Sequence, residues 1–124
     1  MNTQRGATTK ILIVEDDIII ASLIENFLLP KGYTIVGKAS FGDEAIILAA
    51  QHHPDLILMD IGLAGKMDGI TAADFILNLF SIPFIFISGH DDDDTLTRSI
   101  EVHPHSFIIK PFTAKHLYTN IGIA

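Results

Sequence analysis

Three carboxylates in this chain stand where runs of apolar residues end, which makes them candidates for chemistry. Glu15 and Asp16 follow the apolar run 11–14, and Asp60 closes a second run, 56–59. Each run is apolar throughout, which is typical of a strand buried on both faces of a parallel sheet. Carboxylates crowded into one pocket repel each other. Their presence together therefore indicates a hard divalent cation, a carboxylate nucleophile, or both.

The elements that would position these acids alternate along the chain. Residues with strand patterns are 10–14, 33–37, 54–60, 84–88 and 106–109. Helical patterns cover 17–29, 69–80 and 91–102, a stretch from a cap at Ser40 or Asp43 to about 52, and the end of the chain from a cap at Thr113. We also expect Asp17 to cap the first helix. The alternation predicts an α/β fold with a doubly wound five-stranded parallel sheet, whose strands present their carboxyl ends along one edge.

Length and composition narrow the class of protein. With 124 residues, of which 48% are hydrophobic, we expect a polar, disordered lead over 1–9 and one folded domain over 10–124. A net charge of −7 with only eight lysines and arginines argues against direct nucleic-acid binding. The absence of cysteine excludes disulfides and thiolate metal sites. No segment has the apolar length of a membrane span or the core of a signal peptide, so we predict a soluble cytoplasmic protein.

The ends of the other predicted strands add a hydroxyl and an amine to the same edge. Ser88 ends the fourth strand, and Lys110, followed by Pro111, comes after the fifth. This set, in this order and spacing, resembles the receiver domain of bacterial-type response regulators. The matching stretches are Ile-Leu-Ile-Val-Glu-Asp-Asp at 11–17, Pro-Asp-Leu-Ile-Leu-Met-Asp at 54–60, Met-Asp-Gly-Ile at 67–70, Ser-Gly at 88–89 and Lys-Pro-Phe at 110–112. The resemblance covers the chain from about residue 10 to its end and implies the flavodoxin-like receiver fold.

The resemblance also implies roles for the polar residues of this edge. Asp60 would accept a phosphoryl group as a nucleophile, in a domain that assists its own phosphorylation and dephosphorylation rather than acting as an enzyme. Lys110 and Ser88 would each hold a phosphoryl oxygen. The implied ligands of a Mg²⁺ or Mn²⁺ ion are Asp16 and Asp60 directly, Glu15 directly or through water, and the backbone carbonyl of Gly62.

A change of shape would follow phosphorylation. By resemblance, the hydroxyl of Ser88 moves toward the phosphoryl group, and the side chain of Phe107, on the fifth strand, turns into the space that it leaves. Phe107 lacks the hydroxyl of the tyrosine that is common at this position. We therefore expect its ring to stay buried more readily and to respond less to phosphorylation. The phosphoryl group would bias an equilibrium between two states that both exist beforehand.

The resemblance implies one partner upstream, which donates the phosphoryl group, and one downstream, which the domain controls. The phosphoryl group would come from a sensor histidine kinase or a histidine-phosphotransfer protein. Ile18 and Ile19 lie outside the buried stripe of the first helix, where they either pack locally or dock that partner. Downstream, the domain would control a partner protein or an output domain. The chain fits both a single-domain regulator and a piece of a larger protein, and a homodimer through the fourth helix, the fifth strand and the last helix remains open.

Three other functions compete with this one. A flavodoxin-like binder of flavin mononucleotide has the same fold, but Glu15, Asp16 and Asp17 would repel its phosphate. A haloacid-dehalogenase-type phosphatase places its nucleophile after the first strand, whereas Asp60 follows the third. A receiver that is never phosphorylated and serves only as an interaction module is disfavoured, because all five site positions are present.

Overall fold

The structure, a computed structural model, describes residues 9–63, 65–89 and 93–122. Its strands are β1 (Lys10–Val14), β2 (Thr34–Ala39), β3 (Leu56–Asp60), β4 (Phe84–Ser88) and β5 (Ser106–Ile109). Its helices are α2 (Ile18–Leu28), α3 (Gly42–His52), α4 (Gly69–Phe80), α5 (Asp93–Glu101) and α6 (Ala114–Gly122), with a short 3₁₀ turn, η1 (Leu29–Lys31), after α2.

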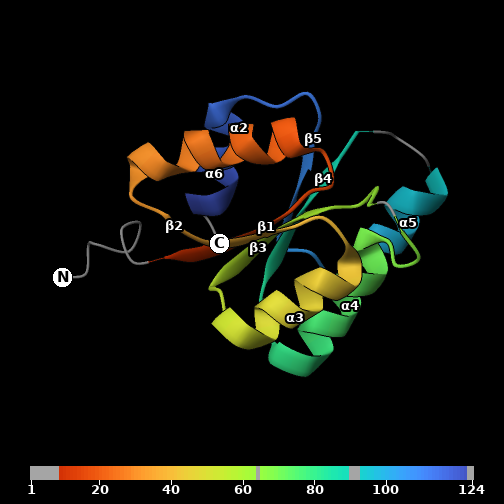
Figure 1. Cartoon of the computed structure of the whole chain (residues 1–124). Coiled ribbons are helices and arrows are strands. Elements are labelled where there is room, and N and C mark those ends of the chain that lie inside the picture. Colours follow the sequence, from red (N-terminus) through yellow and green to blue (C-terminus); the bar gives the residue numbers. More distant parts are fainter. Residues whose placement is uncertain (1–8, 64, 90–92, 123–124) are drawn as a thin grey trace.

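The strands form one parallel sheet in the order β2-β1-β3-β4-β5. Helices α2 and α6 cover one face, and α3, α4 and α5 cover the other (Figure 1). The chain therefore winds in both directions from β1, which places the carboxyl ends of β1, β3 and β4 side by side. The predicted fold class is confirmed.

The three inner strands are buried almost completely, which explains their apolar sequences. Every residue of β3 and β4 is buried, as is every residue of β1 except Lys10. Because side chains alternate along a strand, each inner strand supplies both layers of the core. Thus Leu12 and Ile57 pack beneath α3 and α4, whereas Ile13 and Leu58 pack beneath α2 and α6.

The predicted bounds of the first helix and the second strand differ from those of the structure, and β3 begins at Leu56 rather than at 54. The first helix ends at Leu28, and η1, which contains Pro30, completes the turn before Gly32 adopts φ 89°. The second strand runs from Thr34 to Ala39 rather than over 33–37. The second strand extends to Ala39 because the chain at the end of β1 still provides backbone hydrogen-bond partners: the Glu15 N–H donates to the carbonyl of Ala39 at 2.9 Å. Pairing along the sheet thus overrides the local pattern.

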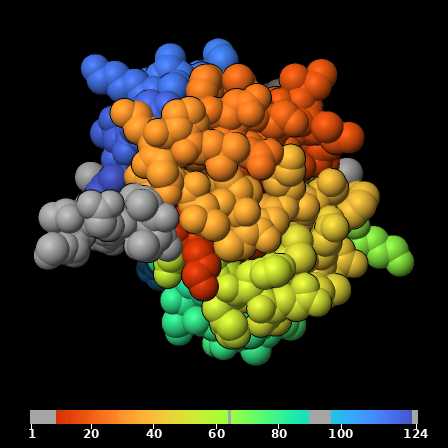
Figure 2. Space-filling view, turned by 60° about the vertical axis from the view of Figure 1, so that its left-hand side comes forward, coloured from red at the N-terminus to blue at the C-terminus, as the bar shows by residue number. Residues whose placement is uncertain are grey.

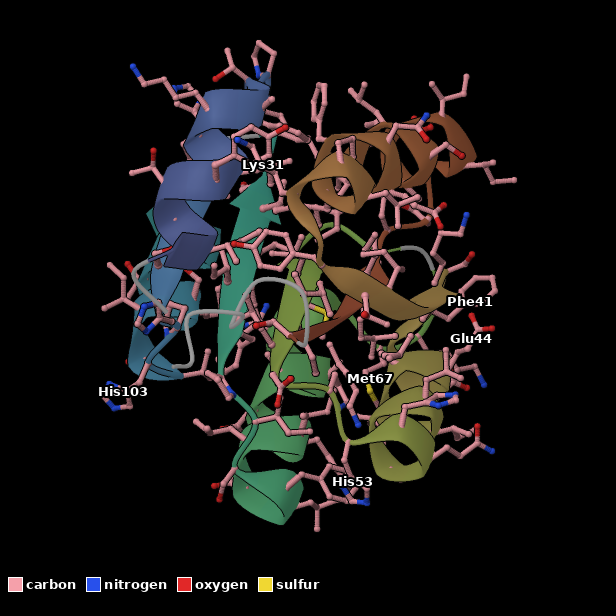
Figure 3. The ribbon with its side chains drawn as sticks, turned by 90° about the vertical axis from the view of Figure 1, so that its left-hand side faces the viewer. Lys31, Phe41, Glu44, His53, Met67 and His103 are labelled. Carbon is pink, nitrogen blue, oxygen red and sulfur yellow. The ribbon has the colours of Figure 1, made fainter. Side chains whose placement is uncertain are left out.

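The cap predicted for the second helix is wrong. Phe41 occupies the N-cap position of α3 and its side chain makes no capping hydrogen bond; instead, a carboxylate oxygen of Glu44 accepts a bond from the Ser40 N–H at 2.8 Å. The helix starts here because Gly42 packs against the neighbouring loop: a Cβ at this glycine would lie 2.9 Å from Cγ of Met67. Figure 3 shows Phe41 and Glu44 together at this end of α3, with His53 at its other end.

The last two helices largely agree with the predictions made from the sequence. Helix α5 ends at Glu101, one residue earlier than predicted; residues 90–92 and the side chains of 93–96, which hold the acidic run, lie outside the described part. Thr113 caps α6 as predicted, because its hydroxyl accepts a bond from the His116 N–H at 3.2 Å. In the described ranges, no helix has the length and apolarity needed to cross a membrane.

Candidate functional site

A cleft of about 770 Å³ opens at the carboxyl ends of the inner strands. Its lining includes all six residues to which the sequence assigns a chemical role, namely Glu15, Asp16, Asp60, Gly62, Ser88 and Lys110. These residues come from four strand ends, or the loops directly after them, that are far apart in the sequence. The sheet order brings them together, because the ends of β1 and β4 both flank the end of β3.

Asp60 lies at the centre of this edge and is held firmly. It is the last residue of β3, it is 5% exposed, and it pairs with Ile87 of β4. One of its carboxylate oxygens, Oδ1, accepts a hydrogen bond from the Gly62 N–H at 3.1 Å. Behind it, the N–H of Gly69 donates to the carbonyl of Ile61 at 3.1 Å, which presses the start of α4 against the Asp60 backbone. The carboxylate therefore faces the cleft from a fixed backbone.

Lys110 joins the two buried acids. Its Nζ lies 3.0 Å from Oε1 of Glu15 and 3.5 Å from Oδ2 of Asp60. The N–H of Lys110 donates a hydrogen bond of 2.7 Å to the carbonyl of Ser88, which ties its backbone to the end of β4; the Lys110–Pro111 peptide is cis. The neighbouring carboxylates raise the pKa of Lys110 above its usual value, despite an opposing effect of burial. Lys110 is therefore a firmly charged cation at the base of the cleft.

The charged form of Glu15 is disfavoured in this cleft. Burial first, and the adjacent carboxylate of Asp60 second, raise the pKa of Glu15 from 4.5 to about 7. Lys110 and the Asp17 N–H, which donates to Oε2 of Glu15 at 3.1 Å, oppose this shift but do not cancel it. Without a bound cation, the folded domain therefore holds Glu15 at an energetic cost near neutral pH.

This cost predicts how the stability of the metal-free domain depends on pH. Because Glu15 binds its proton more tightly in the folded state, its contribution to stability is present below pH 4.5 and is lost as the pH rises to about 7. We expect the free energy of unfolding, measured by urea titration in EDTA, to fall across this range. In Glu15→Gln, the free energy of unfolding should depend less on pH over this range. If it fell as steeply as in wild type, Glu15 would not be the group responsible.

The acids of the cleft fit a hard divalent cation. In the part of the chain that the structure describes, Glu15, Asp16 and Asp60 form the one group that could hold a metal ion, with ligand atoms within 4.8 Å of one another. Oε1 of Glu15 is buried and accepts no hydrogen bond from any described residue, since its contact with Lys110 is an ion pair without hydrogen-bond geometry. Carboxylate oxygens are the donors that Mg²⁺ or Mn²⁺ selects.

The two residues of the predicted switch occupy neighbouring strands. Ser88 ends β4, is 4% exposed and lines the cleft. Phe107 pairs with Phe86 of β4 and packs edge-on against its ring, with 6.1 Å between ring centroids. It is half-buried against the core and does not line the cleft. Whether its ring responds to phosphorylation stays a prediction.

Two charged residues of the cleft had no assigned role in the sequence. Asp68 caps α4, since its Oδ1 accepts a bond from the Thr71 N–H at 2.8 Å, and its Oδ2 accepts a bond from Nη1 of Arg98 at 3.1 Å. The Met-Asp-Gly-Ile motif at 67–70 marked Asp68. No sequence pattern marked Arg98, because only packing brings α5 to the rim of the cleft. Asp17, which also lines the cleft, caps α2 as predicted.

The isoleucines proposed for docking lie beside this cleft on the first turn of α2. Ile18 is 77% exposed and Ile19 is 79% exposed, so neither contributes to the core. They follow Asp17, whose Oδ1 accepts hydrogen bonds from the Ile19 and Ile20 N–H groups. In Figure 2 the first part of α2, in red-orange, stands at the edge of the molecule. Local packing therefore does not account for these two side chains.

The fold and the site together define a signalling domain. Residues 11–122 match the model of the response regulator receiver domain. Because this match covers most of the chain, the protein belongs to that family and is a receiver domain of two-component signalling. The predicted resemblance is confirmed.

Individual relatives and a solved structure support this family assignment. The chain is 33% identical to the chemotaxis protein CheY of Bacillus subtilis, over 91% of this chain and 94% of CheY. It is 33% identical to the transcriptional regulatory protein PdtaR of Mycobacterium tuberculosis, of which it spans 56%. Among solved structures, the signal receiver domain of a modulated diguanylate cyclase from Desulfovibrio desulfuricans superposes with a TM-score of 0.89 at 34% identity, with 93% of this chain and 91% of that one covered.

Proposed function

We propose that this receiver accepts a phosphoryl group on Asp60 in a reaction that requires Mg²⁺ or Mn²⁺, and that it assists both the formation and the loss of this group. One observation carries the proposal: the carboxylate of Asp60 lies in an open cleft, 3.5 Å from the ammonium of Lys110 and within 4.8 Å of two further acids. Such a carboxylate has a counter-charge and a cation site, the two features that phosphoryl transfer to it requires.

In this reaction an oxygen of Asp60 attacks the phosphorus of the donor. The new bond joins that oxygen to phosphorus, while the bond from phosphorus to the leaving group breaks and the leaving group takes its electron pair. Lys110 holds an equatorial oxygen of the moving group as a point charge, and Ser88 donates a hydrogen bond to another. Asp16, Asp60, Glu15 and the carbonyl of Gly62 would hold the cation, which offsets the charge of the phosphoryl oxygens when bound.

Intact-mass spectrometry tests this function. After incubation with acetyl phosphate and Mg²⁺, we expect the protein to gain the mass of one phosphoryl group, and to gain none when EDTA replaces the ion. Reductive trapping of the acyl phosphate with borohydride, followed by peptide mapping, should place the group on the peptide that contains Asp60. No gain in mass, or a group on another residue, would overturn the proposal.

In the cell, we propose that the donor is a histidine kinase or a histidine-phosphotransfer protein in the cytoplasm that docks on the first turn of α2. The exposure of Ile18 and Ile19, next to the cleft, supports this surface. The double variant Ile18→Ser, Ile19→Ser should lose about tenfold in phosphotransfer rate from the cognate protein, because two apolar contacts are lost, but should react normally with acetyl phosphate. Unchanged phosphotransfer would contradict the docking surface.

The phosphoryl group would then act through β4 and β5. We propose that Ser88 moves toward it and that Phe107, which packs on Phe86, follows, so that α5, β5 and α6 present a changed face to a partner, an output domain or a second copy of the chain. Because Phe107 has no hydroxyl to hold it at the surface, this ring should change less than a tyrosine would. Structures with and without beryllofluoride that show a complete outward-to-inward change would contradict this.

A further inference from the structure

We propose that Arg98 is a second phosphate-binding cation of the cleft, which draws the anionic phosphodonor in from the rim, while Asp68 holds it in place until the donor arrives. The inference rests on the proposed phosphorylation of Asp60 and adds a donor-binding residue to it. Arg98 comes from α5 and lines the cleft together with the acids that follow β1.

The charge of the cleft creates the need for such a residue. Its described lining contains five carboxylates and only two cations, Lys110 and Arg98. A phosphodonor is itself an anion, so this excess of negative charge opposes its approach even when a divalent ion occupies the base. Lys110 is committed there, at 3.0 Å from Glu15 and 3.5 Å from Asp60. Arg98 is therefore the cation that faces a donor as it enters.

Asp68 fixes the resting place of Arg98. Its two oxygens serve different partners, since Oδ1 caps α4 through the Thr71 N–H and Oδ2 contacts the guanidinium of Arg98. The next residue, Gly69, is packed against the Asp60 backbone. The guanidinium is thus held at a defined position relative to the phosphoacceptor, although it comes from a different helix.

The ion pair between Arg98 and Asp68 is also weak enough for a phosphodonor to replace Asp68. The side chain of Arg98 is 51% exposed and that of Asp68 is 37% exposed, and ion pairs with such exposure contribute little to stability. The contact is made through Nη1 alone at 3.1 Å, whereas the planar fork of a guanidinium can bind a phosphoryl group through two parallel N–H bonds. A dianionic donor can therefore replace Asp68 as the partner of Arg98 at small cost.

The rate of phosphorylation by acetyl phosphate tests the role of Arg98. At low ionic strength and low donor concentration, Arg98→Gln should lower the apparent second-order rate constant about fivefold, the effect of one charge contact of moderate strength. The loss should appear in the donor concentration for half-maximal rate rather than in the maximal rate, and it should shrink at high salt. Arg98→Lys, which keeps the charge, should retain most of the rate.

Lys66→Gln is the matched control. It removes the same charge from an exposed residue of the loop between β3 and α4, but Lys66 does not line the cleft, so the rate should be unchanged. Asp68→Asn keeps an oxygen to cap α4 but releases Arg98. It should raise the rate by a larger factor in the wild-type background than in the Arg98→Gln background, because part of its effect acts through Arg98.

The outcomes separate this inference from the function on which it rests. Equal rates for wild type and Arg98→Gln would overturn the role of Arg98 alone, as would an equal loss in Lys66→Gln or a factor for Asp68→Asn that does not depend on Arg98. A loss that is independent of salt and accompanied by a lower melting temperature would show that Arg98 only fastens α5. If the wild-type protein itself accepts no phosphoryl group, the proposed function fails.

Discussion

Asp60→Asn is expected to abolish phosphorylation of this domain while making the metal-free protein more stable. The amide lacks the nucleophilic oxygen, so no acyl phosphate can form at this position. It also removes one charge from a buried cluster in which Asp60 raises the pKa of Glu15. Lys110 keeps its closer partner, Glu15, at 3.0 Å. Relief of the repulsion should therefore raise the free energy of unfolding in EDTA by on the order of 1 kcal/mol.

The same cluster predicts the effect of a divalent ion on this variant. Mg²⁺ should stabilise the wild-type protein, because it binds the folded state and not the unfolded chain, and should stabilise Asp60→Asn much less. Asp55→Asn is the matched control, since Asp55 is an exposed acid whose carboxylate accepts a bond from the Lys10 N–H, far from the cleft lining. Phosphorylation of Asp60→Asn at the wild-type rate would refute the site, and a lower stability of this variant in EDTA would refute the electrostatic account.

The largest effect on folding is expected from Gly69→Ala. A Cβ at this position would overlap the carbonyl oxygen of Asp60 and lie 2.9 Å from both the Asp60 carbonyl carbon and Cα of Ile61. These are backbone atoms of the phosphoacceptor strand and cannot move aside as a side chain could. We expect a loss of about 3 kcal/mol in the free energy of unfolding, at the upper end for overpacking, and a displaced Asp60.

Gly122→Ala is the matched control for this substitution. It also adds one methyl group to a helical glycine, but no atom of the described residues lies within 4 Å of the added atom, its chain neighbours and its own helix backbone aside. Alanine should therefore stabilise α6 by a few tenths of a kcal/mol or more, through its higher helix propensity. Urea unfolding of both variants should give shifts of opposite sign. Equal stability of Gly69→Ala and wild type would mean that α4 does not rest on the Asp60 backbone as the structure has it.

The acids of the site were predictable because local sequence patterns mark them. Strands that are buried on both faces require unbroken apolar runs, so the polar residue that ends each run stands out, as Glu15 and Asp60 do. Caps formed by adjacent residues were predictable for the same reason, as with Asp17 and Thr113. The cap of α3 was not, because a contact between Gly42 and the distant Met67 determines where that helix begins.

The sequence by itself thus determined the alternation of strands and helices, the parallel sheet and the identity of the acids, the lysine and the serine at its edge, since each depends on residues close together in the chain. Only the tertiary structure decided that Lys110 lies between Glu15 and Asp60, that Glu15 is held with a raised pKa, and that Arg98 reaches the cleft through Asp68. These features depend on distances between side chains of different elements. Such distances are set by packing of the helices on the sheet, which no local pattern encodes.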